Sequence, residues 1–247
     1  MVGGPCGSPE PPGRFWIFDF GFWIEETGIA SFLIVVAAGS GSRLGRPEPK
    51  ALVPVFGRPL LSWTLEALSS LSFAGTVVAA PPGRLDEIRA LVGDGSKVVE
   101  GGETRAASVR NAFQACGAGG RHLVCIHDAA RPFVTPVEVA AILRAAEEGG
   151  VAIAATPIPD TVKKLEKGRI AATLDRTNLW AAGTPQVFRA ELLARALESG
   201  DEATDEAALC ETLGIPVAVV PVSRLGFKIT TPEDLEIAEA ILRGRVR

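Results

Sequence analysis

The sequence predicts a doubly wound α/β fold on a mostly parallel sheet, from which one β-hairpin arm projects. Short, nearly continuous apolar runs alternate with stretches whose apolar residues recur at three- and four-residue spacings. This alternation is typical of buried parallel strands and the helices that cover them. Residues 157–188 break it, because a charged turn around Lys167-Gly168 joins two extended pieces. That pattern is typical of a hairpin.

The predicted elements follow one another in a regular order. The strands are "FLIVVAA" (32–38), "GTVVAA" (75–80), "SKVVE" (96–100), "RHLVCIHDA" (121–129), "GVAIAATPI" (150–158) and "IPVAVVPV" (215–222). The helices between them are "PLLSWTLEALSSL" (59–71), "LDEIRALV" (85–92), "TRAASVRNAFQAC" (104–116) and "TPVEVAAILRAAEE" (135–148). Thr135 and Thr231, each followed by proline and then an acidic residue, mark two capped helix starts.

The first thirty residues differ from the rest of the chain. A turn-forming stretch, "MVGGPCGSPEPPGR", precedes "FWIFDFGFWI", which has six aromatic residues in ten positions. The apolar stretch is too short to span a bilayer and lacks the marks of a secretory signal. We interpret residues 1–30 as an accessory or disordered extension, with a partner- or membrane-contacting hook as the alternative. Residues 31–247 are predicted to form one domain, because no linker divides them.

Composition limits the functions that the chain can have. It is 47% hydrophobic and 22% charged, a globular balance, and its formal net charge of −4 argues against nonspecific nucleic-acid binding. Two histidines and four scattered cysteines without a CxxC pair are poor material for a zinc site or a disulfide framework. We therefore expect free, buried thiols in a reducing compartment, and a cytoplasmic protein with no membrane segment.

A glycine-rich loop, "AAGSGSRLGRPEPKA" (37–51), follows the first predicted strand of the domain. Its glycines let the backbone approach a phosphate closely, and Arg43 and Lys50 offer counter-charge. Pro47 and Pro49 stiffen the segment that carries the lysine. In a doubly wound sheet this strand end is where ligands bind. The loop is therefore predicted to bind a nucleoside triphosphate. The alternative is that it is an ordinary solvated turn.

The loop does not match the two commonest glycine-rich motifs. A dinucleotide fingerprint requires a third glycine where Leu44 stands, and an acid at the end of the second strand, which instead reads "VVAAPPG". A Walker loop requires Gly-Lys-Ser/Thr after four intervening residues, and neither Gly39 nor Gly41 supplies it. A nicotinamide oxidoreductase and a P-loop enzyme are thus disfavoured.

Other polar residues also fall at predicted strand ends. Asp128 in "HDAARPF" is placed to hold magnesium, although a turn cap would use the same residue. In "GGETRAASV" (101–109), Glu103, Arg105 and Ser108 could contact a base edge or simply begin a helix. His127 lies on an apolar strand, and we interpret it as a packed structural residue.

Seven motifs occur in the order found in the 2-C-methyl-D-erythritol 4-phosphate cytidylyltransferase family, which the chain resembles over residues 32–242. They are "AAGSGSRLGRPEPKAL", "GGETRAASV", "HDAARPF", "DTVKKL", "DRTNLWAAGTPQ", "TDEAAL" and "KITTPEDL". The resemblance implies a Rossmann-like nucleotidyltransferase fold. It also implies transfer of CMP from CTP to 2-C-methyl-D-erythritol 4-phosphate, giving 4-diphosphocytidyl-2-C-methyl-D-erythritol and pyrophosphate in the non-mevalonate isoprenoid pathway.

Two alternatives remain beside that function. One is a cytidylyltransferase for another polyol phosphate, such as ribitol 5-phosphate, since sibling enzymes share most motifs. The other is a non-catalytic nucleotide-binding module, which the set of Arg43, Lys50 and Asp128 disfavours.

The resemblance also implies roles for individual residues. Catalysis is assigned to Arg43, Lys50, Arg176 and Lys228, the first two as transition-state stabilisers. CTP is assigned to Ala37, Ala38, Gly39, Gly41, Gly102, Glu103, Ser108 and Ala129. The acceptor is assigned to Arg131, Thr161, Arg176, Thr204 and Lys228, and Mg²⁺ or another divalent cation to Asp128.

The resemblance further implies a homodimer, in which the arm (about residues 157–185) carries Thr161 and Arg176 to the partner's site. The chain departs from the family pattern at two places. Family members often have an acidic residue shortly before the lysine of the last motif, whereas residues 223–227 here contain none. The usual aspartate of the base-reading motif is replaced by Glu103, which has a longer side chain.

Overall fold

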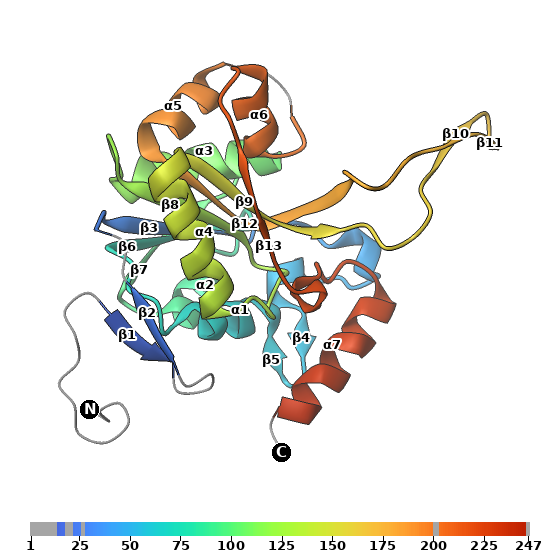
Figure 1. Ribbon diagram of the computed structural model, residues 1–247. Coiled ribbons are helices and arrows are strands. Elements are labelled where there is room, and N and C mark those ends of the chain that lie inside the picture. The colour runs from blue at the N-terminus through green and yellow to red at the C-terminus, as the bar shows by residue number, and fades with distance from the viewer. Residues whose placement is uncertain (1–13, 18–21, 26–27, 200–202, 246–247) are drawn as a thin grey trace.

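The computed structural model describes residues 14–17, 22–25, 28–199 and 203–245. Its central sheet has seven strands: β3 (Ser31–Val36), β6 (Gly75–Ala80), β7 (Ser96–Glu100), β8 (Leu123–Asp128), β9 (Val151–Pro157), β12 (Trp180–Arg189) and β13 (Ala218–Pro221). Their order is β13-β9-β12-β8-β3-β6-β7 (Figure 1). β12 runs antiparallel to both neighbours, β8 and β9, and the other adjacent pairs are parallel.

Helices cover both faces of this sheet, as a doubly wound fold requires. One face packs against α1 (Leu60–Leu68), α2 (Leu85–Val92) and α4 (Pro136–Gly149), and the other against α3 (Arg105–Cys116), α5 (Ala190–Glu198) and α6 (Glu206–Thr212). The alternation of side chains along β3 shows the division: Leu33 and Val35 belong to the first core cluster, and Ile34 belongs to the second. The predicted fold class is confirmed.

A third apolar cluster lies beside the sheet and supports the loops of the candidate site. It joins α7 (Pro232–Arg245) to β4 (Pro54–Val55), which pairs with β5 (Arg58–Pro59). Figure 1 shows α7 beside this short pair of strands. Leu44 from the glycine-rich loop and Ile229 from the last motif are both buried in it, 2% and 0% exposed. Packing therefore ties together two loops that are far apart in the sequence.

The predicted helix starts are present. Thr135 and Glu138 form a complete capping box at α4, in which each side chain accepts a hydrogen bond from the other residue's backbone N–H. At α7, Asp234 accepts hydrogen bonds from the backbone N–H groups of Thr230 and Thr231. Helices α5 and α6 are additions to the elements that the sequence predicted.

The stretch 157–188 needs a correction. Its first part forms the expected arm, with β10 (Lys163–Glu166) paired to β11 (Arg169–Thr173). Lys167 and Gly168 make the turn with positive φ angles of 50° and 75°, as a two-residue hairpin loop favours. Residues 180–188, however, belong to β12 and return to the central sheet. All residues of β10 and β11 are exposed, and the arm extends away from the body of the domain (Figure 1).

Part of the N-terminal stretch is described. β1 (Arg14–Ile17) pairs antiparallel with β2 (Phe22–Glu25), and β2 contacts α4. Residues 1–13, 18–21 and 26–27 lie outside the described residues, so the interpretation of residues 1–30 stays a prediction. In the described part of the chain, no helix combines the length and apolarity needed to cross a membrane. Cys116, Cys125 and Cys210 are free and buried, whereas Cys6 lies outside the described residues.

Candidate active site

A cleft of about 480 Å³ lies where β3 and β8 end. The chain leaves β3 toward β6 and β7 on one side, and later enters β8 on the other side. Such a reversal of strand order is the usual ligand site of a doubly wound sheet. Twelve of the predicted site residues line the cleft: Ala37, Ala38, Gly39, Gly41, Arg43, Lys50, Gly102, Glu103, Ser108, Asp128, Ala129 and Lys228.

The glycine-rich loop folds back on itself, so that Lys50 lies against its first half. The backbone N–H of Lys50 donates to the Gly39 carbonyl at 3.2 Å. Gly41 has a φ of 70°, and a Cβ atom there would lie 2.9 Å from the Cβ of Lys50. Glycine is thus required at position 41 both for its conformation and for the close approach. Pro49 and the short 3-10 helix Lys50–Leu52 then fix the backbone of the lysine.

Lys50 lies in a strongly positive environment. Its Nζ donates to the Ile229 carbonyl at 3.0 Å, which links the glycine-rich loop to the loop that carries Lys228. Burial, together with the charges of Lys228 and Arg43, lowers the pKa of Lys50 to about 8. Arg43 and Lys50 of the glycine-rich loop and Lys228 of the last motif face one cleft, which is therefore suited to a polyanion.

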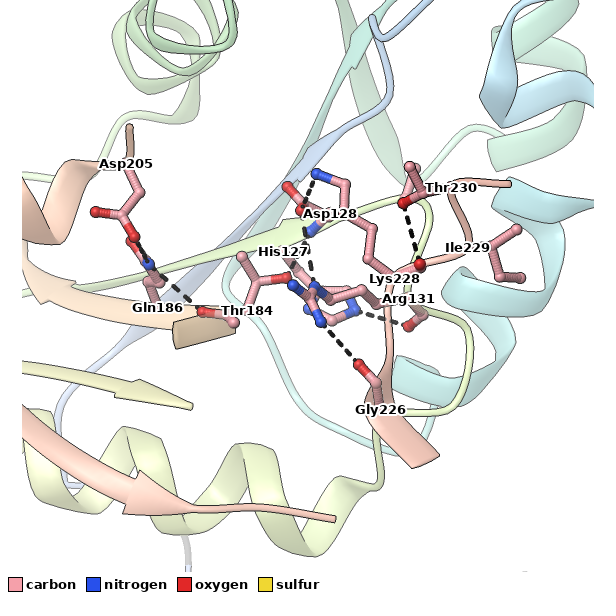
Figure 2. Close-up of polar contacts among 12 residues, drawn as sticks. His127, Asp128, Arg131, Thr184, Gln186, Asp205, Gly226, Lys228, Ile229 and Thr230 are labelled. Carbon is pink, nitrogen blue, oxygen red and sulfur yellow. Dashed lines mark hydrogen bonds and ion pairs between the residues drawn. The ribbon is translucent and has the colours of Figure 1, made fainter. Parts of the chain in front are cut away.

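Asp128 gathers cations at the floor of the cleft. Its Oδ1 accepts from the Nε of Arg105 at 3.2 Å. Its Oδ2 accepts from the Nζ of Lys228 at 2.7 Å, and the Nε of Arg131 is 3.8 Å from that oxygen (Figure 2). The backbone N–H of Asp128 donates to the Thr184 hydroxyl at 3.0 Å. Burial alone would raise the pKa of Asp128, but the charges of Arg105 and Lys228 hold it well below its usual range. The carboxylate is therefore ionised at neutral pH.

Sequence reasoning treated Arg105 as a possible base contact or helix-starting residue, and it did not assign a role to Glu206. The Nη1 of Arg105 lies 2.5 Å from the Oε2 of Glu206, which is 1% exposed at the start of α6. Burial raises the pKa of Glu206, and Arg105 opposes that shift. Both residues stand inside quoted motifs, "GGETRAASV" and "TDEAAL", but each also fits a helix start. No local pattern in the sequence indicates their pairing, which the fold creates between the starts of α3 and α6.

The loop before α3 forms the far wall of the cleft. The Gly102 N–H donates to the Ser108 hydroxyl at 3.1 Å, and that hydroxyl donates to the Thr104 carbonyl at 2.9 Å. A Cβ atom at Gly102 would lie 2.4 Å from the Cβ of Ala107, so the loop packs tightly on the helix. This rigid wall presents Glu103 and backbone groups to the cleft, as the base-reading hypothesis requires.

A second cavity, of about 310 Å³, adjoins the first. Lys228 lines both cavities, and Arg131 lines the second, where its Nη1 donates to the Gly226 carbonyl at 2.9 Å (Figure 2). Thr161, Arg176 and Thr204 line neither cavity. Thr161 and Arg176 are exposed on the arm, where Arg176 donates to the Pro159 carbonyl. Within one chain, the predicted acceptor residues are thus brought together only in part.

Asp128 is the residue assigned to a divalent cation. Among the described residues, no group of three or more His, Cys, Asp or Glu side chains could hold a metal. Asp128 and Glu103 both line the cleft, and one or two carboxylates suffice for magnesium when phosphate oxygens and waters complete its shell. The residues therefore fit an ion held mainly by a nucleotide, provided that Lys228 releases one oxygen of Asp128.

His127 is a buried structural residue, as expected. It is 0% exposed, its Nε2 lies 3.0 Å from the Arg131 carbonyl, and burial lowers its pKa to about 4. A neutral imidazole in the core contacts the backbone of the turn that carries Arg131 (Figure 2). His127 therefore supports the backbone near the site, and it is not among the residues that line the cleft.

Comparison with known proteins gives one result throughout. The family model of 2-C-methyl-D-erythritol 4-phosphate cytidylyltransferase matches residues 31–244. The chain belongs to this family. A protein of that name from Prochlorococcus marinus is 44% identical over 86% of this chain and 98% of its own length; one from Rubrobacter xylanophilus is 42% identical over 87% and 95%.

Solved structures agree. The enzyme of that name from Thermus thermophilus superposes with a TM-score of 0.73 at 38% identity, covering 87% of this chain and 99% of its own. A 4-diphosphocytidyl-2C-methyl-D-erythritol synthase superposes with a TM-score of 0.76 at 30% identity, covering 87% and 100%. The family, the nucleotidyltransferase class and the cytidylyltransferase function predicted from the seven motifs are confirmed.

The geometry of the glycine-rich loop gives a first prediction. Gly41→Ala should weaken CTP binding by at least 10-fold, an effect of about 1.4 kcal/mol, because its Cβ would displace Lys50. Gly45→Ala is the matched control, since Gly45 also has a positive φ, 63°, but nothing lies within 4 Å of its Cβ position. Both variants bear a strain cost of about 1–2 kcal/mol in stability. Titration calorimetry with CTP checks the difference, and equal affinities for the two variants would contradict it.

Proposed function

We propose that the chain transfers CMP from CTP to 2-C-methyl-D-erythritol 4-phosphate at the cleft and the cavity beside it. The observation that carries this proposal is that Lys228 lines both cavities and donates a hydrogen bond to Asp128, which lines the first. The triphosphate would lie on the glycine-rich loop beside Arg43 and Lys50. The cytosine would lie toward Gly102, Glu103 and Ser108. The other residues that we propose to contact the nucleotide are Ala37, Ala38, Gly39, Gly41 and Ala129.

The chemistry follows from the charges. A phosphate oxygen of the acceptor attacks the α-phosphorus of CTP, a new P–O bond forms, and pyrophosphate leaves with the electrons of the broken bond. The attacking oxygen is already ionised, so no side-chain base is needed. Two unit charges about 4 Å apart repel by roughly 4 kcal/mol at an effective dielectric constant of about 20. The site must therefore neutralise charge and align the reactants, which suits Arg43, Lys50 and Lys228.

We propose that Asp128 also holds a divalent cation, Mg²⁺ by its oxygen-ligand preference. When bound, the ion would neutralise phosphate charge and orient the triphosphate. The chain's own part is to keep the carboxylate ionised, which the charges of Arg105 and Lys228 support. Exchange of Lys228 from the Asp128 oxygen to the acceptor phosphate would free that oxygen for the ion.

We propose a homodimer in which the arm completes the partner's site. Thr161 and Arg176 lie on the arm, away from both cavities of their own chain. Leu165 and Ile170 are 61% and 64% exposed on β10 and β11, which supports a covered surface in the assembly.

Thr204, just before α6, is the remaining acceptor contact that we propose. The free, buried thiols support a cytoplasmic location.

The function is tested by pyrophosphate release from CTP with a panel of acceptors. We expect release with 2-C-methyl-D-erythritol 4-phosphate, and little with ribitol 5-phosphate or with CTP alone. A higher kcat/KM with ribitol 5-phosphate would overturn the acceptor assignment. Tight CTP binding without release for any acceptor would instead indicate a non-catalytic binding module. Omission of the divalent cation should abolish release.

Lys50 should contribute to catalysis through its charge. Lys50→Ala is expected to lower turnover by about 10²–10³, the scale of losing one preorganised transition-state contact, with little change in folding. Because the pKa of Lys50 is about 8 in the free protein, kcat/KM for CTP should be full below that pH and fall as the pH rises through it.

The control for the charge effect is Lys50→Arg, whose guanidinium stays protonated throughout. Its kcat/KM should be lower than that of the native chain but should lack the fall near pH 8. Rate profiles between about pH 6.5 and pH 9.5 check this. Near-full activity of Lys50→Ala would remove Lys50 from the mechanism.

The shared site predicts complementation between two inactive variants. In a mixed dimer of Lys50→Ala and Arg176→Ala, one site would combine an intact cleft with an intact arm. Random exchange of subunits makes half of the dimers mixed, so activity should recover to roughly a quarter of the native value. Mass spectrometry would establish subunit exchange, and no recovery despite exchange would count against the shared site.

A further inference from the structure

Four charged residues form a continuous chain of ion pairs through the site: Glu206, Arg105, Asp128 and Lys228. The Oε2 of Glu206 lies 2.5 Å from the Nη1 of Arg105. The Nε of Arg105 lies 3.2 Å from the Oδ1 of Asp128, and the Oδ2 of Asp128 lies 2.7 Å from the Nζ of Lys228. The signs alternate along it. One end is buried on α6, and the other lines both cavities.

The position of Glu206 is unusual for a helix-starting acid. It is 1% exposed, and its neighbours Ala207, Leu209 and Cys210 are buried apolar residues. A charge in such surroundings is unfavourable unless it is paired. The packing of α6 alone does not require a charged side chain at this position. Its partner is a cation that lines the nucleotide cleft. The carboxylate is thus placed where it acts on the site.

Arg105 uses two of its three nitrogens to hold the two carboxylates. Nη1 meets Glu206 and Nε meets Asp128. Its Nη2 is buried and has no hydrogen-bond partner among the described residues. The two fixed contacts determine the plane of the guanidinium and hence the direction of the third nitrogen. Gln186, on β12, donates to Asp205 at 2.8 Å and holds the start of α6 against the sheet.

We propose that Glu206 is a positioning residue of the transfer reaction. It fixes Arg105, and Arg105 in turn fixes the carboxylate of Asp128 in the nucleotide cleft, beside Lys228. Without Glu206, the guanidinium is held only at Asp128 and can turn about that contact. The inference rests on the proposed function, since it assigns Glu206 to the same reaction.

The main test is Glu206→Gln, which keeps the shape of the side chain and removes its charge. We expect kcat/KM for both substrates to fall roughly 10- to 100-fold, the range for loss of a residue that orients a contacting group. Glu66→Gln is the matched control, because Glu66 pairs with Arg58 at 2.6 Å on the exposed surface of α1. The control should retain full kcat/KM, and full activity of Glu206→Gln as well would overturn the proposal.

A double-variant cycle separates positioning from a structural role. If Glu206 acts through Arg105, then Glu206→Gln added to Arg105→Gln should cause no further loss of kcat/KM. A further loss equal to that seen in the native background would overturn the proposal. Arg105→Lys covers the case in which Glu206→Gln fails to fold, since a lysine has one nitrogen and cannot hold both carboxylates as the guanidinium does. Full activity of Arg105→Lys would also overturn it.

A binding measurement distinguishes this inference from the proposed function. Should the native chain bind CTP yet release no pyrophosphate with any acceptor, the proposed function fails. CTP affinity by calorimetry then tests Glu206 alone, because Arg105 lines the nucleotide cleft in either case. Glu206→Gln should bind CTP more weakly than Glu66→Gln, and equal affinities would reject the positioning role.

Discussion

The site depends on one buried carboxylate that stays ionised. Asp128 is 6% exposed at the end of β8, yet its two oxygens are bound to Arg105 and Lys228, and Arg131 stands close by. Without that charge, three cations would face one another in a half-buried space, where their repulsion is weakly screened. Asp128 makes it possible to hold them in place before any substrate arrives.

The topology explains why such different segments meet at Asp128. β3 and β8 are neighbours in the sheet, so the glycine-rich loop and Asp128 start from adjacent strand ends. The antiparallel strand β12 then brings Thr184 to the backbone of Asp128 and Gln186 to α6. The third apolar cluster holds Ile229, and with it the loop of Lys228, against the loop of Lys50. Packing thus converts four distant motifs into one surface.

Sequence reasoning recovered the features with a local signal. The lengths of the apolar runs and the spacing of apolar residues between them identified the parallel strands, and capping residues identified the starts of α4 and α7. Both signals depend only on residues that are close together in the sequence. β12 was assigned to the hairpin, since "WAAGTPQVF" has no clear alternation and its burial comes from β8 and β9 on either side. Arg105 and Glu206 are 101 positions apart in the sequence, so their pairing leaves no local pattern.

The lowered pKa of Lys50 shows what this preorganisation costs. Burial and the charges of Lys228 and Arg43 disfavour its protonated form in the free protein. The same cations would be stabilised once a triphosphate lies among them, so binding relieves repulsion that folding has built into the site. Part of the interaction that we propose with the nucleotide is therefore prepared in advance by the sheet, the two prolines before Lys50 and the third cluster. A site of this kind needs little rearrangement within one chain. In the proposed homodimer, the exposed arm is then the element whose contacts depend on a second copy.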